Sequence, residues 1–104
     1  MPKVAVLAKM TAKDGQGQAL VDALSGMIKA VGEEAGTEIY ALHTDAASSD
    51  VVWFYELYTD KDALGAHSGS DAMKALGPSL GSLLAGRPEI TLLNPVSAKG
   101  VSFG

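Results

Sequence analysis

The sequence predicts one α+β domain in which helices cover one face of an antiparallel sheet. The chain has 104 residues, which is room for a single domain with one hydrophobic core. Short β-rich runs alternate along it with segments in which apolar residues recur at helical spacing. Their order is strand, helix, strand, strand, helices, strand. We expect the domain to occupy residues 3–97 and residues 98–104 to form a C-terminal tail.

The first predicted element is a strand over residues 4–10. This run (VAVLAKM) is short and rich in β-forming residues, and it contains no helix-capping residue. Asp14 and Gly15 follow it and are typical of a turn. Asp14 is also a candidate N-cap for the helix that begins after the turn.

The next predicted element is an amphipathic helix that begins near Gln16. Apolar residues recur there every three or four positions, so they share one helix face. That face consists of Leu20, Leu24, Ile28 and Val31, with Met27 beside them. We expect the helix to end near Ala35, with Gly36 in the left-handed conformation that often follows a helix.

Two further strands are predicted to follow as a hairpin. Residues 37–44 (TEIYALHT) form the first strand, and residues 45–50 (DAASSD) are polar and predict a longer connecting loop. Residues 51–58 (VVWFYELY) form the second strand. Because this run is dense in β-branched and aromatic residues, it is the strongest strand prediction in the chain.

Short helices are predicted next. Thr59 is a candidate cap, with Asp62 three residues later, for a helix that runs to His67. Ser70 is a candidate cap for a second helix over residues 71–76.

The dipeptide Gly77-Pro78 is expected to end that second helix, since proline cannot continue a helical hydrogen-bond ladder. Three leucines continue a helical apolar pattern beyond it: Leu80, Leu83 and Leu84. Gly86 and Pro88 then stop the pattern. Residues 89–96 (EITLLNPV) predict the last strand.

This order of elements is the split βαβ arrangement of a ferredoxin-like fold. Both faces of the predicted strand over residues 51–58 carry apolar or aromatic side chains, whereas the helices can cover only one face. An apolar sheet face without a cover favours a second subunit. We therefore expect a homodimer.

Composition excludes several function classes. The formal net charge is −4, and the eight Lys and Arg residues are scattered from Lys3 to Lys99. Nucleic acid and anionic membranes are therefore not expected as partners. The chain has no cysteine, so disulfides and thiolate nucleophiles are excluded. Residues 1–9 lack a secretion-signal pattern and no apolar stretch is long enough to span a membrane, so we expect a cytoplasmic protein.

Residues 15–20 (GQGQAL) resemble a dinucleotide-binding fingerprint but do not satisfy it. They lie between a predicted strand and a predicted helix, as that fingerprint does. Its third glycine is replaced by Leu20, and the chain is too short for a doubly wound sheet. We interpret the glycines as easing the start of the helix and predict no nucleotide cofactor.

Several short motifs point to one family when they are taken in order. The motifs are residues 36–40 (GTEIY), residues 54–60 (FYELYTD), Ala66-His67 and residues 86–90 (GRPEI). Together they resemble the antibiotic biosynthesis monooxygenase domain, over nearly the whole chain from Val4 to about Val96. The resemblance implies two ferredoxin-like sheets packed face to face as a dimeric α/β barrel.

The resemblance also implies a class of chemistry. Members of the family include quinol monooxygenases, enzymes that oxidise polyketide phenols without flavin or metal, and haem-degrading enzymes. The implied function is a monooxygenase, independent of flavin and metal, that oxidises a small quinol or phenolic substrate with O2. Two alternatives stay open: a binding protein of the same fold for a small aromatic or haem-like ligand, and a non-oxidative isomerase.

The haem-degrading branch of the family is not favoured. Its members use an Asn on the first strand, a Trp at the end of the third strand and a His further along. The corresponding positions here hold Lys9 or Met10, Tyr58 and about Gly77. This set argues against a haem oxygenase.

His67 is the first candidate catalytic residue. Flavin-free oxygenation of a phenol needs a base, because the phenolate anion is the species that transfers an electron to O2. Imidazole suits this role near neutral pH, and the family has a His at the matching place. The alternative is a half-exposed histidine at a helix end with no chemical role.

Glu56 is the second candidate catalytic residue. It shares a strand face with Phe54 and Tyr58, so its carboxylate is either buried with a partner or lines a pocket. There it could orient His67 or act as the base itself with a raised pKa. The alternative is a structural carboxylate bonded to a neighbouring strand or to a lysine.

Three aromatic residues are predicted to bind the substrate: Tyr40, Tyr58 and Phe54. The two tyrosines could donate hydrogen bonds to a substrate oxygen while their rings stack on it. The alternative is a pair of core tyrosines whose hydroxyls reach water.

Trp53 and His43 have the opposite strand parity to these residues. We expect Trp53 to pack in the dimer core, and His43 ranks below His67 as a candidate base. A metal site built from His43, His67 and Glu56 is not predicted, because their spacing does not support one.

Overall fold

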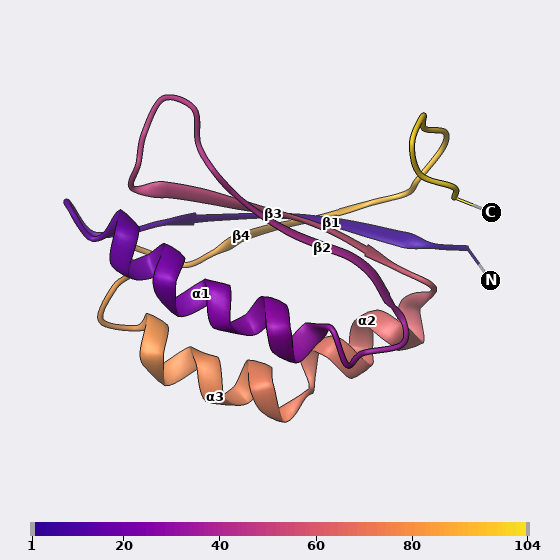
Figure 1. Cartoon of the computed structure of the whole chain (residues 1–104), viewed down its shortest axis with the longest axis horizontal. Helices are drawn as coiled ribbons and strands as arrows, with labels where there is room; N and C mark the ends of the chain where they lie inside the picture. Colours follow the sequence, from indigo (N-terminus) through magenta and orange to yellow (C-terminus); the bar gives the residue numbers. More distant parts are fainter. Residues whose placement is uncertain (1, 104) are drawn as a thin grey trace.

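The computed structural model describes residues 2–103. Residue 1 and residue 104, the last residue of the predicted tail, lie outside this range. Its elements follow the predicted order (Figure 1). The strands are β1 (Val4–Thr11), β2 (Thr37–Thr44), β3 (Val51–Tyr58) and β4 (Glu89–Leu93), and the helices are α1 (Gly17–Val31), α2 (Lys61–Ser68) and α3 (Asp71–Leu80). None of the described helices is long and apolar enough to cross a membrane.

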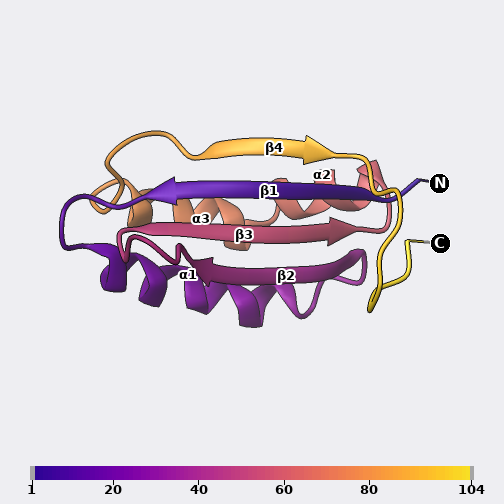
Figure 2. The ribbon, with the colours of Figure 1, turned by 90° about the horizontal axis from the view of Figure 1, so that it is seen from above.

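The four strands form one sheet in the order β2-β3-β1-β4, and every neighbouring pair is antiparallel (Figure 2). The helices lie together on one face of this sheet (Figure 1). The other face carries no helix, and the chain beyond β4 turns over one end of it (Figure 1). This architecture confirms the predicted α+β, ferredoxin-like fold.

The strand register places side chains in straight rows across the helix-covered face. One row consists of Leu92, Val6, Glu56 and Tyr40. The next row consists of Ile90, Ala8, Phe54 and Leu42. Since neighbouring residues of a strand point to opposite faces, Trp53 and His43 lie on the helix-free face, as their parity predicted.

The hydrophobic core lies between this face and α1. Leu20 and Leu24 are fully buried there, against Phe54 and other core residues of the sheet. The predicted helix face is wrong in one position: Ile28 is 39% exposed, whereas Met27 is buried. Leu20, Leu24, Met27 and Val31 follow a spacing of four, three and four residues, which stays on one helical stripe.

The start of α1 is not capped by Asp14, contrary to the prediction. The carboxylate of Asp50, in the β2–β3 loop, accepts hydrogen bonds from the backbone N–H groups of Gly15 (3.0 Å) and Gly17 (2.9 Å). A Cβ on Gly17 would lie 1.9 Å from the carbonyl oxygen of Ser49. The loop therefore packs directly against the helix start, and only glycine fits there.

The end of α1 also differs from the prediction. The helix ends at Val31, its last buried residue, and not near Ala35. Gly36 does not adopt a positive φ. A Cβ on Gly36 would lie 2.4 Å from the Cβ of Ala63. The absence of a side chain at position 36 therefore allows the segment before β2 to pass close to α2.

The cap of α2 is Asp60 and not Thr59. The Asp60 carboxylate accepts a hydrogen bond from the N–H of Ala63 (2.8 Å), whereas the Thr59 hydroxyl donates to Glu38 (2.9 Å). An extended residue at position 60 satisfies the capping geometry. The cap of α3 is the hydroxyl of Ser70, as predicted.

Two predicted boundaries in the second half are wrong. Helix α3 continues through Pro78 to Leu80, because a proline near the helix end removes only one backbone donor. Leu83 and Leu84 therefore lie beyond the helix, where Leu84 forms an isolated bridge with Ala12. Strand β4 ends at Leu93 and not at residue 96, because Pro95 cannot donate to a strand ladder.

The close approach at Gly17 leads to a stability prediction. We expect Gly17→Ala to lower the free energy of unfolding by about 2 kcal/mol or more, because the methyl group must displace the Ser49 carbonyl. Gly26→Ala is the matched control, since nothing lies within 4 Å of a Cβ there. It should raise stability by roughly 0.5–1 kcal/mol. Urea unfolding at one protein concentration measures both, and equal effects would contradict the close packing of the loop.

Candidate active site

A cavity of about 520 Å³ lies between the helix-covered face of the sheet and helices α2 and α3. Its volume is in the usual range for small-molecule sites. Its wall consists of Val6, Ala8 and Met10 of β1, Tyr40 of β2, Phe54 and Glu56 of β3, Leu64, His67 and Ser68 of α2, Met73, Leu76, Gly77 and Leu80 of α3, and Arg87, Pro88, Ile90 and Leu92 at or near β4. Most of this wall is apolar, so the few polar side chains on it would orient a ligand.

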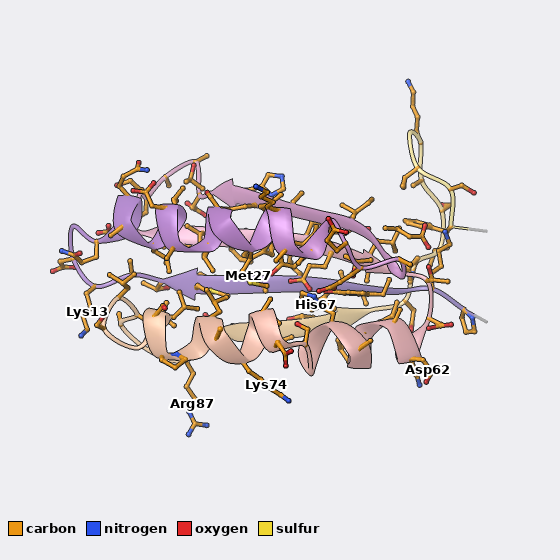
Figure 3. All side chains as sticks on the ribbon, turned by 60° about the horizontal axis from the view of Figure 1, so that its bottom comes forward. Lys13, Met27, Asp62, His67, Lys74 and Arg87 are labelled. Atoms are coloured by element: carbon orange, nitrogen blue, oxygen red, sulfur yellow. The ribbon has the colours of Figure 1, made fainter. Side chains whose placement is uncertain are left out.

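His67 is buried, with 3% of its surface exposed, which rules out the half-exposed histidine considered from the sequence. Figure 3 shows it between the row formed by α1 and the row formed by α2 and α3. Its Nδ1 lies 2.8 Å from Oε1 of Glu34. The Thr37 hydroxyl donates to the same oxygen (2.9 Å). With a proton on Nδ1 donated to Glu34, Nε2 is the nitrogen left to accept a proton.

Glu34 was not predicted as a site residue. It lies in the turn after α1, where its N–H donates to the carbonyl of Val31 (2.9 Å) and its own carbonyl accepts from Thr37 (3.2 Å). The close contact of Gly36 with Ala63 brings this turn against α2. One signal was available in the sequence: a carboxylate just beyond a helix C-terminus is unfavourable beside the helix dipole, so its presence suggests another role.

Glu56 lines the cavity and is 7% exposed. The Tyr58 hydroxyl donates a hydrogen bond to its Oε1. Burial raises the pKa of the Glu56 carboxyl, although the Tyr58 hydrogen bond and the nearby His67 act against this shift. The sequence suggested Glu56 as the group that orients His67, but the carboxylate hydrogen-bonded to Nδ1 of His67 is that of Glu34.

Aromatic rings surround His67. The Tyr40 ring stacks on Phe54 at 4.5 Å between centroids, and it lies 5.1 Å from the His67 ring. The Tyr58 ring centroid lies 5.4 Å from that of His67. Tyr40 and Phe54 are on the cavity wall, whereas Tyr58 is not. Tyr58 thus donates to Glu56 from outside the cavity wall, whereas the sequence suggested that it contacts the substrate directly.

The hydroxyls of Tyr40 and Tyr58 are held in the protonated form. Burial raises the pKa of both phenols, and the nearby Glu56 carboxylate raises them further. Each tyrosine can therefore act as a hydrogen-bond donor.

Trp53 and His43 take no part in this cavity. The Trp53 Nε1 donates to Asp45 (2.9 Å), a contact that lowers the pKa of that carboxyl, and the Nζ of Lys9 lies 5.4 Å from the Trp53 ring centroid. His43 is exposed on the helix-free face. Within residues 2–103, no group of three or more His, Cys, Asp or Glu side chains is arranged to hold a metal ion.

The model of the family described as antibiotic biosynthesis monooxygenase matches residues 3–77. The chain belongs to this family. Family membership confirms the resemblance drawn from the sequence motifs. No curated protein is significantly similar to this monooxygenase-family chain.

Solved structures support the same assignment for this antibiotic biosynthesis monooxygenase family member. PA3566 from Pseudomonas aeruginosa is 25% identical, with a TM-score of 0.86 over 93% of this chain and 97% of its own. Rv0793 from Mycobacterium tuberculosis is 28% identical, with a TM-score of 0.84 over 92% and 97%. A Caulobacter crescentus protein described as a candidate antibiotic biosynthesis monooxygenase is 28% identical, with a TM-score of 0.86 over 92% of each chain.

The buried carboxyl of Glu56 leads to a pH prediction. Its pKa is raised above the ordinary value of 4.5, so the folded protein binds this proton more tightly than the unfolded chain. The stabilisation is fully present below pH 4.5 and is lost as the pH rises through the folded-state pKa. Glu56→Gln still accepts the Tyr58 hydrogen bond but cannot ionise. We expect the variant to gain stability relative to the wild type across this window.

Urea unfolding of both proteins over a pH series measures this difference. Glu38→Gln is the control, because Glu38 is exposed and its hydrogen bond with Lys3 lowers its pKa. Its contribution therefore has the opposite sign and is lost as the pH falls. A Glu56→Gln difference that stays constant with pH would contradict a raised pKa at Glu56.

Proposed function

We propose that this protein is a cofactor-independent monooxygenase that oxidises a small quinol or phenolic compound with O2. One observation carries the proposal: a buried His67, backed by the Glu34 carboxylate, lines an apolar cavity beside the stacked rings of Tyr40 and Phe54. A base held in one orientation against an aromatic wall suits the deprotonation of a phenol. Membership of a monooxygenase family supports it.

In the proposed first step, Nε2 of His67 accepts the proton of the substrate hydroxyl. The Nδ1–H group donates to Glu34, which stabilises the imidazolium that forms. The phenolate then transfers one electron to O2, and the resulting phenoxyl radical and superoxide combine to form a carbon–oxygen bond. The ring carbon then loses its hydrogen as a proton while the peroxide O–O bond breaks. This leaves one oxygen on the product as a quinone carbonyl and releases the other, with two protons, as water. The substrate supplies all the electrons, so no reductant is needed.

The other cavity residues have positioning and proton-transfer roles in this proposal. Tyr40 donates a hydrogen bond to a substrate oxygen, and Phe54 supports the ring from the sheet side. Because its pKa is raised, Glu56 is more readily protonated than an exposed carboxyl and supplies a proton when the O–O bond breaks. Tyr58 keeps the Glu56 carboxyl in place.

Oxygen uptake with a panel of quinols and phenols tests the base. We expect His67→Ala to lower kcat by at least a hundredfold, since general-base catalysis contributes about that much or more. Glu34→Ala should lower kcat with little change in KM, because the imidazole loses its fixed orientation. Glu34→Gln should recover part of the loss, since its amide oxygen can still accept from Nδ1.

Lys29→Ala is the control for these variants, because Lys29 is exposed on α1 and lies outside the cavity wall and the helix-free face. It should leave the rate unchanged. Full activity of His67→Ala would overturn the role given to His67. Turnover that continues without air would favour an isomerase, and ligand binding without oxygen uptake would favour a binding protein.

We also propose that two copies of the chain pack through their helix-free faces as a dimeric α/β barrel. The support is the row of side chains on that face of β3, where Trp53 and Tyr55 are half-buried and no helix covers them. Such an apolar sheet face favours a partner.

Light scattering at micromolar concentration tests the dimer. We expect twice the chain mass of 10.7 kDa. Tyr55→Asp should give a monomer, because it places a charge in the proposed interface. Ile28→Asp, at an exposed position on α1, should leave the dimer intact. A wild-type protein that is monomeric at this concentration would contradict the proposal.

A further inference from the structure

Two large aliphatic side chains on the helix-covered face are left open to water. Ile90 and Leu92 of β4 are 58% and 62% exposed. Both line the same cavity as Glu56 and His67. Exposed aliphatic side chains that continue the wall of a cavity suggest that the cavity extends to the sheet edge to take an apolar part of its ligand.

The strand register gives the direction of this extension. Leu92 pairs with Val6 and Val6 pairs with Glu56, so Leu92 lies two strand spacings, about 10 Å, from Glu56. Ile90 lies beside Ala8 in the neighbouring row. We name these residues the β4 trough: Val6, Ala8, Ile90 and Leu92. It leads from the polar end of the cavity to the open edge of the sheet.

Helix α3 forms the opposite side of the β4 trough through Met73 and Leu76. This helix packs against α1 and contacts β4 at most sparsely, so it leaves the edge strand uncovered. Arg87 also belongs to the cavity wall, and Figure 3 shows its side chain extending away from the body of the protein. The floor and both sides of the trough are therefore apolar.

The occupant follows from these positions. A second copy packed on the helix-free face does not cover Ile90 and Leu92, because they point to the other side of the sheet. We propose that the β4 trough binds an alkyl chain attached to the substrate ring, so that the substrate is an alkylated phenol or quinol. The ring's position beside Glu56 and His67 rests on the proposed function.

Calorimetric titration with 4-ethyl-, 4-butyl- and 4-hexylphenol in the absence of O2 tests this proposal without turnover. We expect the affinity of the wild type to rise about two- to fourfold for each methylene group added. The double variant Ile90→Thr with Leu92→Thr should flatten this dependence, with the largest loss of affinity for 4-hexylphenol. Threonine keeps the strand preference of these positions. Val96→Thr is the control, because Val96 is an exposed aliphatic residue outside the cavity.

Each outcome decides for or against the trough. A dependence on chain length that the double variant loses and Val96→Thr keeps would support it, whatever the oxygen-uptake assay shows. Equal affinity of the wild type for the three phenols, or a dependence that survives the double variant, would overturn it. A double variant that changes the oligomeric state but keeps the dependence would assign Ile90 and Leu92 to a subunit interface. Those outcomes would leave the proposed oxidation at His67 untouched, because the oxygen-uptake assay tests it separately.

Discussion

The contact between Glu34 and Nδ1 of His67 is the interaction on which the candidate site depends. It joins the turn after α1 to the last turn of α2, two segments 33 residues apart in the chain. A buried imidazole without a partner would be unfavourable, so the carboxylate supports both the burial and the orientation of the ring. Gly36 allows the approach, because any side chain there would collide with Ala63.

The sheet register adds the second part of the site. Glu56 and Tyr40 are direct neighbours in one row, and Phe54 follows in the next row, so the polar and aromatic groups meet on the helix-covered face. A slip of β3 by one residue would turn these groups to the other face. The fold and the arrangement of the site therefore depend on the same pairing of β3 with its neighbouring strands. Val6 and Ala8 of β1 lie between the polar end of the cavity and its apolar edge at β4.

The sequence predicted the strands better than the helix ends, for a physical reason. Strands β2 and β3 were predicted to the residue, because alternation and aromatic density are local signals. The carboxylate that binds the start of α1 was not predicted, because it belongs to Asp50, 33 positions away from Gly17. The hydrogen bonds of the candidate site were equally hard to predict, because they also join residues far apart in the chain.

His67 and Glu56 stood out in the sequence as polar residues in apolar or family-like surroundings. Their hydrogen-bond partners could not be predicted from the sequence. The contact of His67 with Glu34, for example, depends on how two helices and a turn pack together. Glu34 lies on no strand face and in no family-like motif, and only its place after a helix end marked it. Long-range contacts of this kind have no periodic trace in a single sequence.

The edge strand β4 has a consequence for how a ligand enters. It has five residues, all of them exposed, and it pairs with β1 alone. Local opening takes place most readily in such segments, well below the free energy of global unfolding. Fraying of β4 would open one side of the cavity without a hinged lid, and its amide hydrogens would exchange early. A ligand bound against β4 would slow that exchange. The rate of ligand release would then depend on how often this one strand opens locally.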